Sequence, residues 1–148
     1  MERILGLDYG DKTVGVAISD PFGWTAQGIE TIHRTDTTNL ILTIERLATL
    51  IKSYDVKKIV LGNPLHMNAD KGERVDKTNY FKNKLEQTFD LPVIMWDERL
   101  TTKSATRTLD EAGVHKSKHK AVIDKIAAVL ILQGYLEAVN NNGGNELG

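Results

Sequence analysis

The sequence predicts an α/β domain built on a mixed five-stranded sheet, three antiparallel strands followed by two parallel strands, flanked by helices. Two observations support this fold class. Three strand-like segments come first, and the links between them are too short for a crossover connection. After them, segments with apolar residues at helical spacing alternate with short apolar runs, a pattern typical of parallel strands joined by helices.

The first strand lies within residues 1–9, an apolar run that ends in a carboxylate. Its apolar residues indicate a buried strand, and Asp8 lies inside the run. A buried carboxylate is costly unless a hydrogen bond or a cation compensates it. Asp8 therefore either caps the following turn through its side chain or serves a bound cation or phosphate, and this stretch alone leaves both possibilities open.

The next segments extend this strand into a meander. Residues 13–20 form a second strand, and the link 10–12 is short enough to require an antiparallel hairpin. A turn at 21–24 leads to a third strand at 26–33.

Helices and strands then alternate, so the fourth strand should lie parallel to the first after a right-handed crossover. The spacing predicts a helix over 40–51 with capping residues at 35–38, a strand at 56–61, a helix over 72–89 and a strand at 92–96.

The carboxyl-terminal part is expected to be helical. A helix is expected at about 101–112, followed by a basic connector at 114–120 and a strongly apolar helix at 121–139. Residues 1–139 are expected to form a single domain, and the Asn/Gly-rich residues 140–148 a flexible tail.

Composition limits the class of protein. The 148 residues suffice for one domain with a core, and 41% hydrophobic and 26% charged residues are ordinary for a soluble globular protein. The net charge of −1 gives no overall basic field, so a nucleic-acid partner would need a local patch. The absence of cysteine excludes disulfides and thiolate metal sites. Without a membrane-length apolar run or a signal peptide, we expect a cytoplasmic protein.

Three acidic positions stand out: Asp8, the pair Asp97 and Glu98 at the end of the fifth strand, and Asp124. Asp124 interrupts a stretch, 122–128, that is otherwise largely apolar. Carboxylates that converge from a strand centre, a strand end and a helix are suited to two hard cations. A pair of Mg²⁺ or Mn²⁺ ions about 4 Å apart can stabilise both the attacking and leaving oxygens of phosphodiester cleavage.

Structural roles for these acids are the alternative. Asp97 and Glu98 could form a solvated strand end, and Asp124 could pair with Lys120 or Lys125 or stabilise the amino end of its helix.

Four ordered motifs make a family resemblance specific. The order of strands and helices is that of the ribonuclease H-like fold, and the sequence resembles the YqgF family of that superfamily. The family is also described as Holliday junction resolvases or pre-16S ribosomal RNA nucleases. The residues that carry the resemblance are Gly6-Leu7-Asp8-Tyr9-Gly10 with Gly15-Val16-Ala17 and Ser19-Asp20, Gly62-Asn63-Pro64, Asp97-Glu98-Arg99-Leu100-Thr101-Thr102, and Asp124 with Ala127-Ala128 and Ile131-Leu132-Gln133.

This resemblance implies metal-dependent endonucleolytic hydrolysis, with Asp8, Glu98 and Asp124 as catalytic and metal-binding carboxylates and two Mg²⁺ or Mn²⁺ ions as cofactors. The implied role is processing of the 5′ end of pre-16S ribosomal RNA in ribosome biogenesis, with Holliday junction resolution as the alternative. A non-catalytic nucleic-acid or ribosome-binding factor is the alternative of another class. A nucleotide-binding phosphotransferase is disfavoured, because sugar kinases close two such domains around ATP, whereas one domain is expected here.

The chain departs from the family in two places and poses one geometric problem. Lys12-Thr13 stands where many relatives have a Lys-Arg pair, and residues 68–74 follow the family's Gly-rich loop only loosely. The acid also comes from the fifth strand, about 10 Å or two strand spacings from the first if it lies outside the fourth, so Glu98 must reach inward. Asp97 should point to the face opposite Glu98.

Substrate binding would use local positive charge, of which about half is expected to be ordinary solvated surface. The best candidate is the basic connector that ends at Lys120. A junction resolvase needs two active sites and hence a dimer, whereas RNA trimming needs one, and we expect a monomer or weak homodimer. The candidate nucleic-acid-binding residues are Lys12, Lys71, Arg74, Arg99, Lys103, Arg107, Lys116, Lys118 and Lys120.

Overall fold

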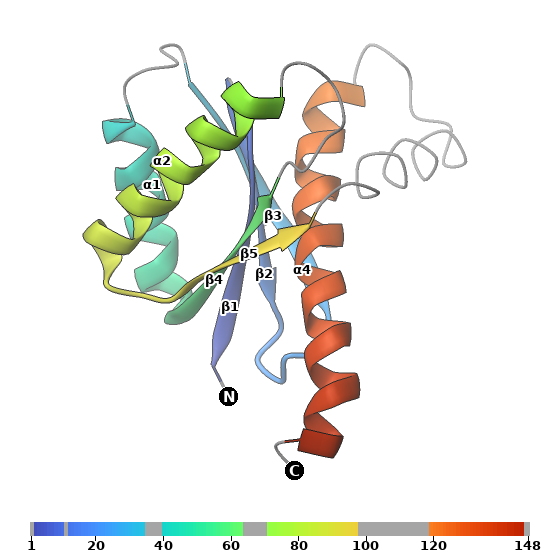
Figure 1. Cartoon of the computed structure of the whole chain (residues 1–148). Coiled ribbons are helices and arrows are strands. Elements are labelled where there is room, and N and C mark those ends of the chain that lie inside the picture. The colour runs from blue at the N-terminus through green and yellow to red at the C-terminus, as the bar shows by residue number, and fades with distance from the viewer. Residues whose placement is uncertain (1, 11, 35–39, 64–70, 98–118, 147–148) are drawn as a thin grey trace.

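The computed structural model describes residues 2–10, 12–34, 40–63, 71–97 and 119–146, with the backbone alone at 71–74, 119–125 and 141–146. The described elements form three layers, with α1 and α2 on one face of a central sheet and α4 on the other (Figure 1). Their bounds are β1 Arg3–Tyr9, β2 Thr13–Ser19, β3 Ala26–His33, α1 Ile41–Tyr54, β4 Val56–Asn63, α2 Lys71–Phe89, β5 Val93–Asp97 and α4 His119–Glu146.

The sheet has the order β3-β2-β1-β4-β5, which places β1 at its centre. β1 and β3 pair with β2 in antiparallel register, whereas β4 pairs in parallel with β1 and β5 in parallel with β4. The expected mixed sheet is therefore confirmed, and β5 lies outside β4. The end of β5 lies about two strand spacings, roughly 10 Å, from β1.

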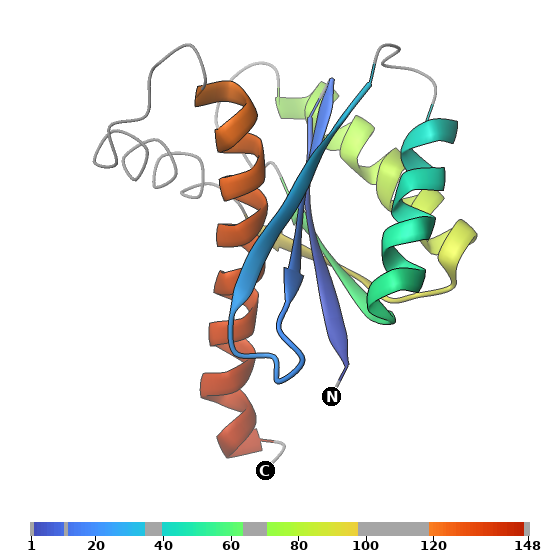
Figure 2. The same ribbon diagram turned by 180° about the vertical axis from the view of Figure 1, so that it is seen from behind.

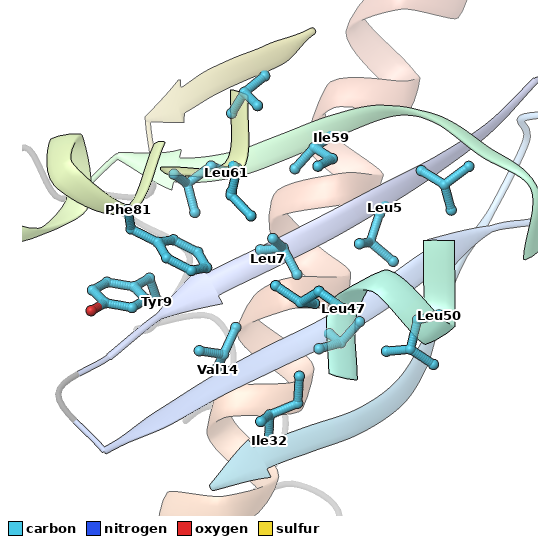
Figure 3. Close-up of a cluster of buried hydrophobic side chains, with 14 of the residues drawn as sticks. Leu5, Leu7, Tyr9, Val14, Ile32, Leu47, Leu50, Ile59, Leu61 and Phe81 are labelled. Atoms are coloured by element: carbon cyan, nitrogen blue, oxygen red, sulfur yellow. The ribbon is translucent and has the colours of Figure 1, made fainter. Parts of the chain in front are cut away.

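Alternation along the strands divides the core between the two faces of the sheet. Leu5 and Leu7 of β1 pack with Leu47 of α1 and Phe81 of α2 in the larger cluster (Figure 3). The opposite face carries a second cluster, in which Ala17 and Val60 pack against apolar residues of α4. The even-numbered positions of β1 therefore face α4.

An ion pair joins β3 to α1. Arg46 Nε donates to Glu30 Oε2 over 2.9 Å, and Arg46 Nη2 donates to Glu30 Oε1 over 2.6 Å. The hydrogen bond and charge of Arg46 hold the pKa of Glu30 below its ordinary value of 4.5. The same contact raises the pKa of Arg46.

The start of α1 lies within one residue of its expected position, whereas the end of α4 differs from the sequence expectation. Leu40 occupies the N-cap position of α1 without a side-chain capping bond and is buried with Leu47 and Leu50. The expected capping residues at 35–38 lie outside the described residues. The last helix was expected to end at Val139 but continues to Glu146. Asn140 donates from Nδ2 to the Gly23 carbonyl over 3.0 Å, a tertiary contact that offsets its low helix propensity.

The expected helix at about 101–112 and most of the basic connector lie outside the described residues. No helix in the described ranges combines the length and apolar character needed to span a membrane.

Candidate active site

Asp8 lies on the central strand of the sheet, between two glycine positions. It pairs with Gly15 of β2, and the parallel register Leu7↔Leu61 continues in the next step to Gly62 of β4. Asp8 is partly buried, whereas both glycines are buried. The positions level with Asp8 on the two neighbouring strands are therefore both glycines, which carry no side chain.

Gly6 fixes which face of the sheet Asp8 occupies. A Cβ atom on Gly6 would lie 2.7 Å from Leu132 Cβ and 3.2 Å from the Ala128 carbonyl oxygen, so Gly6 faces α4 at close range. Asp8 is two residues further along the strand and projects from the same face. Its carboxylate is thus on the side of the sheet that α4 covers.

The backbone of Asp124 approaches this position from the helix. β1 and α4 run in opposite directions, so the carboxyl end of β1 lies toward the amino end of α4 (Figure 1). From the Gly6–Ala128 contact, Asp8 is two strand residues away, about 6.6 Å, and Asp124 is four helical residues away, about 6 Å, in the same direction. The fold therefore brings Asp8 and the backbone of Asp124 to the same end of the β1–α4 interface.

Asp97 is the last residue of β5, and the alternation of side chains along this strand shows which face of the sheet it continues. Val93 and Met95 pack in the cluster under α1 and α2, whereas Ile94 and Trp96 pack in the cluster under α4. Asp97 ends the strand opposite Asn63 and continues the Met95 side, away from the face of Asp8. Glu98 lies outside the described residues.

Of the basic residues expected to bind nucleic acid, Lys12 is the one whose side chain is described. It is exposed in the β1–β2 turn, four residues after Asp8. The structure describes only the backbone at Lys71, Arg74 and Lys120, and Arg99, Lys103, Arg107, Lys116 and Lys118 lie outside the described residues.

A metal cluster is not complete within the described side chains. Among them, no group of three or more His, Cys, Asp or Glu residues is placed to hold an ion. Of the three expected carboxylates, only Asp8 has a described side chain. Its oxygens belong to the hard donor class that Mg²⁺ and Mn²⁺ prefer, and its setting on a strand with glycine neighbours fits such an ion.

Arg34 is a buried residue at this end of the sheet that the sequence did not single out. Its Nη1 donates to the Tyr9 hydroxyl over 2.8 Å, its Nη2 donates to the Gly10 carbonyl, and its backbone N–H donates to the Lys12 carbonyl over 2.7 Å. Tyr9 in turn stacks on Phe81 of α2 with ring centroids 4.2 Å apart. These contacts fix the hairpin that carries Asp8 and Lys12 to β3 and α2. A single arginine after a strand gives no sequence signal of this role.

Comparisons with known proteins agree over almost the whole chain. The family model described as "RuvX: Holliday junction resolvase" matches residues 2–138. A protein of Bacillus licheniformis named "Putative pre-16S rRNA nuclease" is 54% identical over 139 residues, which cover 94% of this chain and 99% of the relative. The protein of the same name from Bacillus subtilis (strain 168) is 53% identical over 138 residues, 93% of this chain and 99% of the relative.

Solved structures share the fold at low sequence identity. Thermus thermophilus RuvC in complex with a Holliday junction substrate has a TM-score of 0.55 and 12% identity, covering 93% of this chain and 95% of that chain. The Fowlpox virus resolvase, in complex with Holliday junction DNA, has a TM-score of 0.54 and 15% identity, covering 93% and 98%. These likenesses confirm the ribonuclease H-like fold.

Proposed function

This chain belongs to the RuvX family, and from that membership we propose that it is a metal-dependent endonuclease that processes the 5′ end of pre-16S ribosomal RNA. The structural observation that carries the proposal is the approach of Asp8 and the backbone of Asp124 at one end of the β1–α4 interface. The substrate class follows the name of relatives that share more than half of their aligned residues with this chain. Hydrolysis of phosphodiester bonds is common to both descriptions of the family.

In this proposal Asp8, Glu98 and Asp124 hold two Mg²⁺ or Mn²⁺ ions. When bound, such ions activate water and stabilise the leaving oxygen of a phosphodiester. Asp8 supplies its carboxylate from the central strand of the sheet, and the hydrogen bonds of Arg34 to Tyr9 and Gly10 hold the end of that strand. An extended chain continuing past Trp96 would bring position 98 to the face that Asp8 shares, so we assign the third ligand to Glu98 and leave Asp97 out.

Binding of the substrate would fall to basic residues around the carboxylates. Lys12 extends from the same hairpin as Asp8 and would contact a backbone phosphate close to the scissile bond. The other expected contacts are Lys71, Arg74, Arg99, Lys103, Arg107, Lys116, Lys118 and Lys120. Lys116, Lys118 and Lys120 lie close together in the sequence of a chain whose net charge is −1. An enzyme acting on ribosomal RNA precursors would work in the cytoplasm.

Junction resolution is the second candidate, because the matching family model is described as a Holliday junction resolvase. That reaction requires two symmetric cuts and therefore two active sites in a dimer. Sedimentation of the protein with and without a four-way junction would reveal such a dimer.

One cleavage experiment separates these functions. The wild type is incubated with a 5′-extended 16S precursor RNA and with a synthetic four-way junction, with Mg²⁺ or Mn²⁺, beside the Asp8→Asn variant. Cleavage of the RNA by the wild type alone is the expected result. Cleavage of the junction alone would favour the resolvase. Failure to cut either, with binding retained by both proteins, would favour a non-catalytic binding factor.

A further inference from the structure

We propose that Gly6 is a positioning residue whose missing side chain lets α4 lie close enough to β1 for Asp124 and Asp8 to share a divalent cation. The inference rests on the metal site of the proposed function and goes beyond it, because Gly6 itself contacts no ligand. It assigns a role in helix–strand spacing to the first glycine of the motif Gly6-Leu7-Asp8-Tyr9-Gly10.

The contact at Gly6 leaves no space for a side chain. A Cβ there would lie 2.7 Å from Leu132 Cβ, 3.2 Å from the Ala128 carbonyl oxygen and 3.4 Å from Leu132 Cδ2. Leu132 and Ala128 are fully buried, so neither can turn outward to relieve the overlap. Backbone must therefore move, and the movable partner is the helix, since β1 is paired on both sides in the centre of the sheet.

The carboxyl-terminal half of α4 is tied to the β2–β3 turn (Figure 2). Gln133 accepts from the Ala26 N–H over 2.9 Å and donates to the Trp24 carbonyl over 3.2 Å. Seven residues further along the helix, Asn140 donates to the Gly23 carbonyl. These bonds hold the second half of the helix in place along the sheet.

The turn that receives these bonds is itself fixed. Asp20 accepts from the backbone N–H groups of Trp24 and Thr25 over 2.7 and 2.9 Å. The hydrogen bond from Thr25 is the leading cause that lowers the pKa of the Asp20 carboxyl, which favours the ionised acceptor. A side chain added at Gly6 would therefore push the amino-terminal half of α4 away from the sheet, while the carboxyl-terminal half stays in place.

Asp124 lies on the side that would tilt. It precedes Ala128 by one turn, whereas Gln133 and Asn140 follow it. Oxygen ligands bind Mg²⁺ within a narrow range, about 2.0–2.1 Å, so a tilt of a few tenths of an ångström at Ala128 would weaken shared binding of an ion.

The test is a titration with Mn²⁺ followed by electron paramagnetic resonance, which needs no substrate and no turnover. Circular dichroism and urea unfolding are recorded for the same proteins. We expect Gly6→Ala to fold but to bind Mn²⁺ about 10- to 100-fold more weakly, as displaced support around metal ligands commonly does. Asp8→Asn marks the loss of a ligand itself.

The matched control is Leu50→Ala, which removes buried volume on the opposite face of the sheet. It should lower stability by at least as much as Gly6→Ala without changing Mn²⁺ affinity. If Gly6→Ala fails to fold, Ala128→Val adds bulk to the same interface from the helix side and should weaken Mn²⁺ binding in the same way.

The outcomes separate this proposal from the function beneath it. Wild-type Mn²⁺ affinity in Gly6→Ala, or in a folded Ala128→Val, would overturn the role of Gly6 and leave the nuclease intact. An equal loss in Leu50→Ala would overturn it too, because stability alone would explain the effect. A wild type that binds no Mn²⁺ would remove both the metal site and the role of Gly6. A wild type that binds Mn²⁺ but cuts neither substrate would refute only the nuclease.

Discussion

Arg34 holds Tyr9 in two ways: its guanidinium donates to the Tyr9 hydroxyl over 2.8 Å and lies 4.6 Å from the centroid of the Tyr9 ring. Tyr9 directly follows Asp8 but points to the other face of the sheet, where it stacks on Phe81. The residue after the candidate catalytic carboxylate is therefore an anchor, and the strand end that presents Asp8 is held from the side opposite to the site.

This anchor predicts a stability effect. Arg34→Met should lower the free energy of unfolding by about 2–4 kcal/mol, because it removes hydrogen bonds from a buried charged group and leaves the Gly10 carbonyl without that donor. Arg46→Met, which breaks a more exposed ion pair, should lower the free energy of unfolding by clearly less. Urea unfolding of both variants measures the difference, and equal losses would show that Arg34 is no anchor.

The three carboxylates predict a loss of cleavage without a loss of fold. Asp8→Asn, Glu98→Gln and Asp124→Asn should each reduce single-turnover cleavage at least about 100-fold, because in the proposed site each removes a negatively charged ligand of the ions. Thermal unfolding should stay close to that of the wild type. A variant that cut at the wild-type rate would remove its residue from the mechanism.

Asp97 offers a neighbouring control for that series. It continues the Met95 side of β5, away from the face of Asp8, so Asp97→Asn should retain cleavage within a few-fold of the wild type. The same single-turnover assay decides this. A loss as large as that of Asp8→Asn would show that the end of the strand presents Asp97 to the ions.

Lys12 predicts a change in salt dependence. Lys12→Ala should weaken binding of the precursor RNA and reduce the slope of log affinity against log salt concentration by about 1, because one phosphate contact is lost. Lys57→Ala, on the opposite end of the sheet and paired with Asp55, should change neither. Fluorescence anisotropy at several salt concentrations measures both. An unchanged slope for Lys12→Ala would place this lysine outside the interface.

The Glu30–Arg46 ion pair predicts a pH dependence of stability. Because the pKa of Glu30 is lower in the folded chain than its ordinary value of 4.5, the pair stabilises the fold fully above that value. The contribution is lost as the pH falls through the folded pKa. At pH 7 the free energy of unfolding of the wild type should exceed that of Glu30→Gln by about 1 kcal/mol or less, since the pair is partly exposed. The difference should disappear at acid pH. Urea unfolding between pH 7 and 3 follows it, and a difference that stayed constant would contradict the assignment.

Much of the fold was predictable because it depends on local pattern. The short link between β1 and β2 required a hairpin, and the alternation of helices and strands required a parallel β4 and β5. The choice of Glu98 over Asp97 as the expected ligand used the same alternation of strand side chains, which Met95 and Trp96 follow by packing on opposite faces of the sheet. The roles of Asp8, Glu98 and Asp124 remain predictions.

Other features could not be found in a local pattern. The N-cap residue Leu40 of α1 is buried and makes no side-chain capping bond, and α4 passes Val139 where a bond from Asn140 reaches Gly23. For α4, helix propensity favoured an earlier end, because propensity describes a residue without its tertiary partners.

The sequence by itself determined the order of the strands, the burial of the first one and the presence of a carboxylate within it, since these follow from periodicity and the lengths of links. Only the tertiary structure decided what surrounds that carboxylate. Gly6 meets Ala128 and Leu132, and Arg34 meets Tyr9, through contacts between segments that are distant in the sequence. The physical reason is that the distance between a packed helix and strand depends on the side chains that face each other across the contact. That distance therefore depends on both segments and cannot be inferred from either one alone.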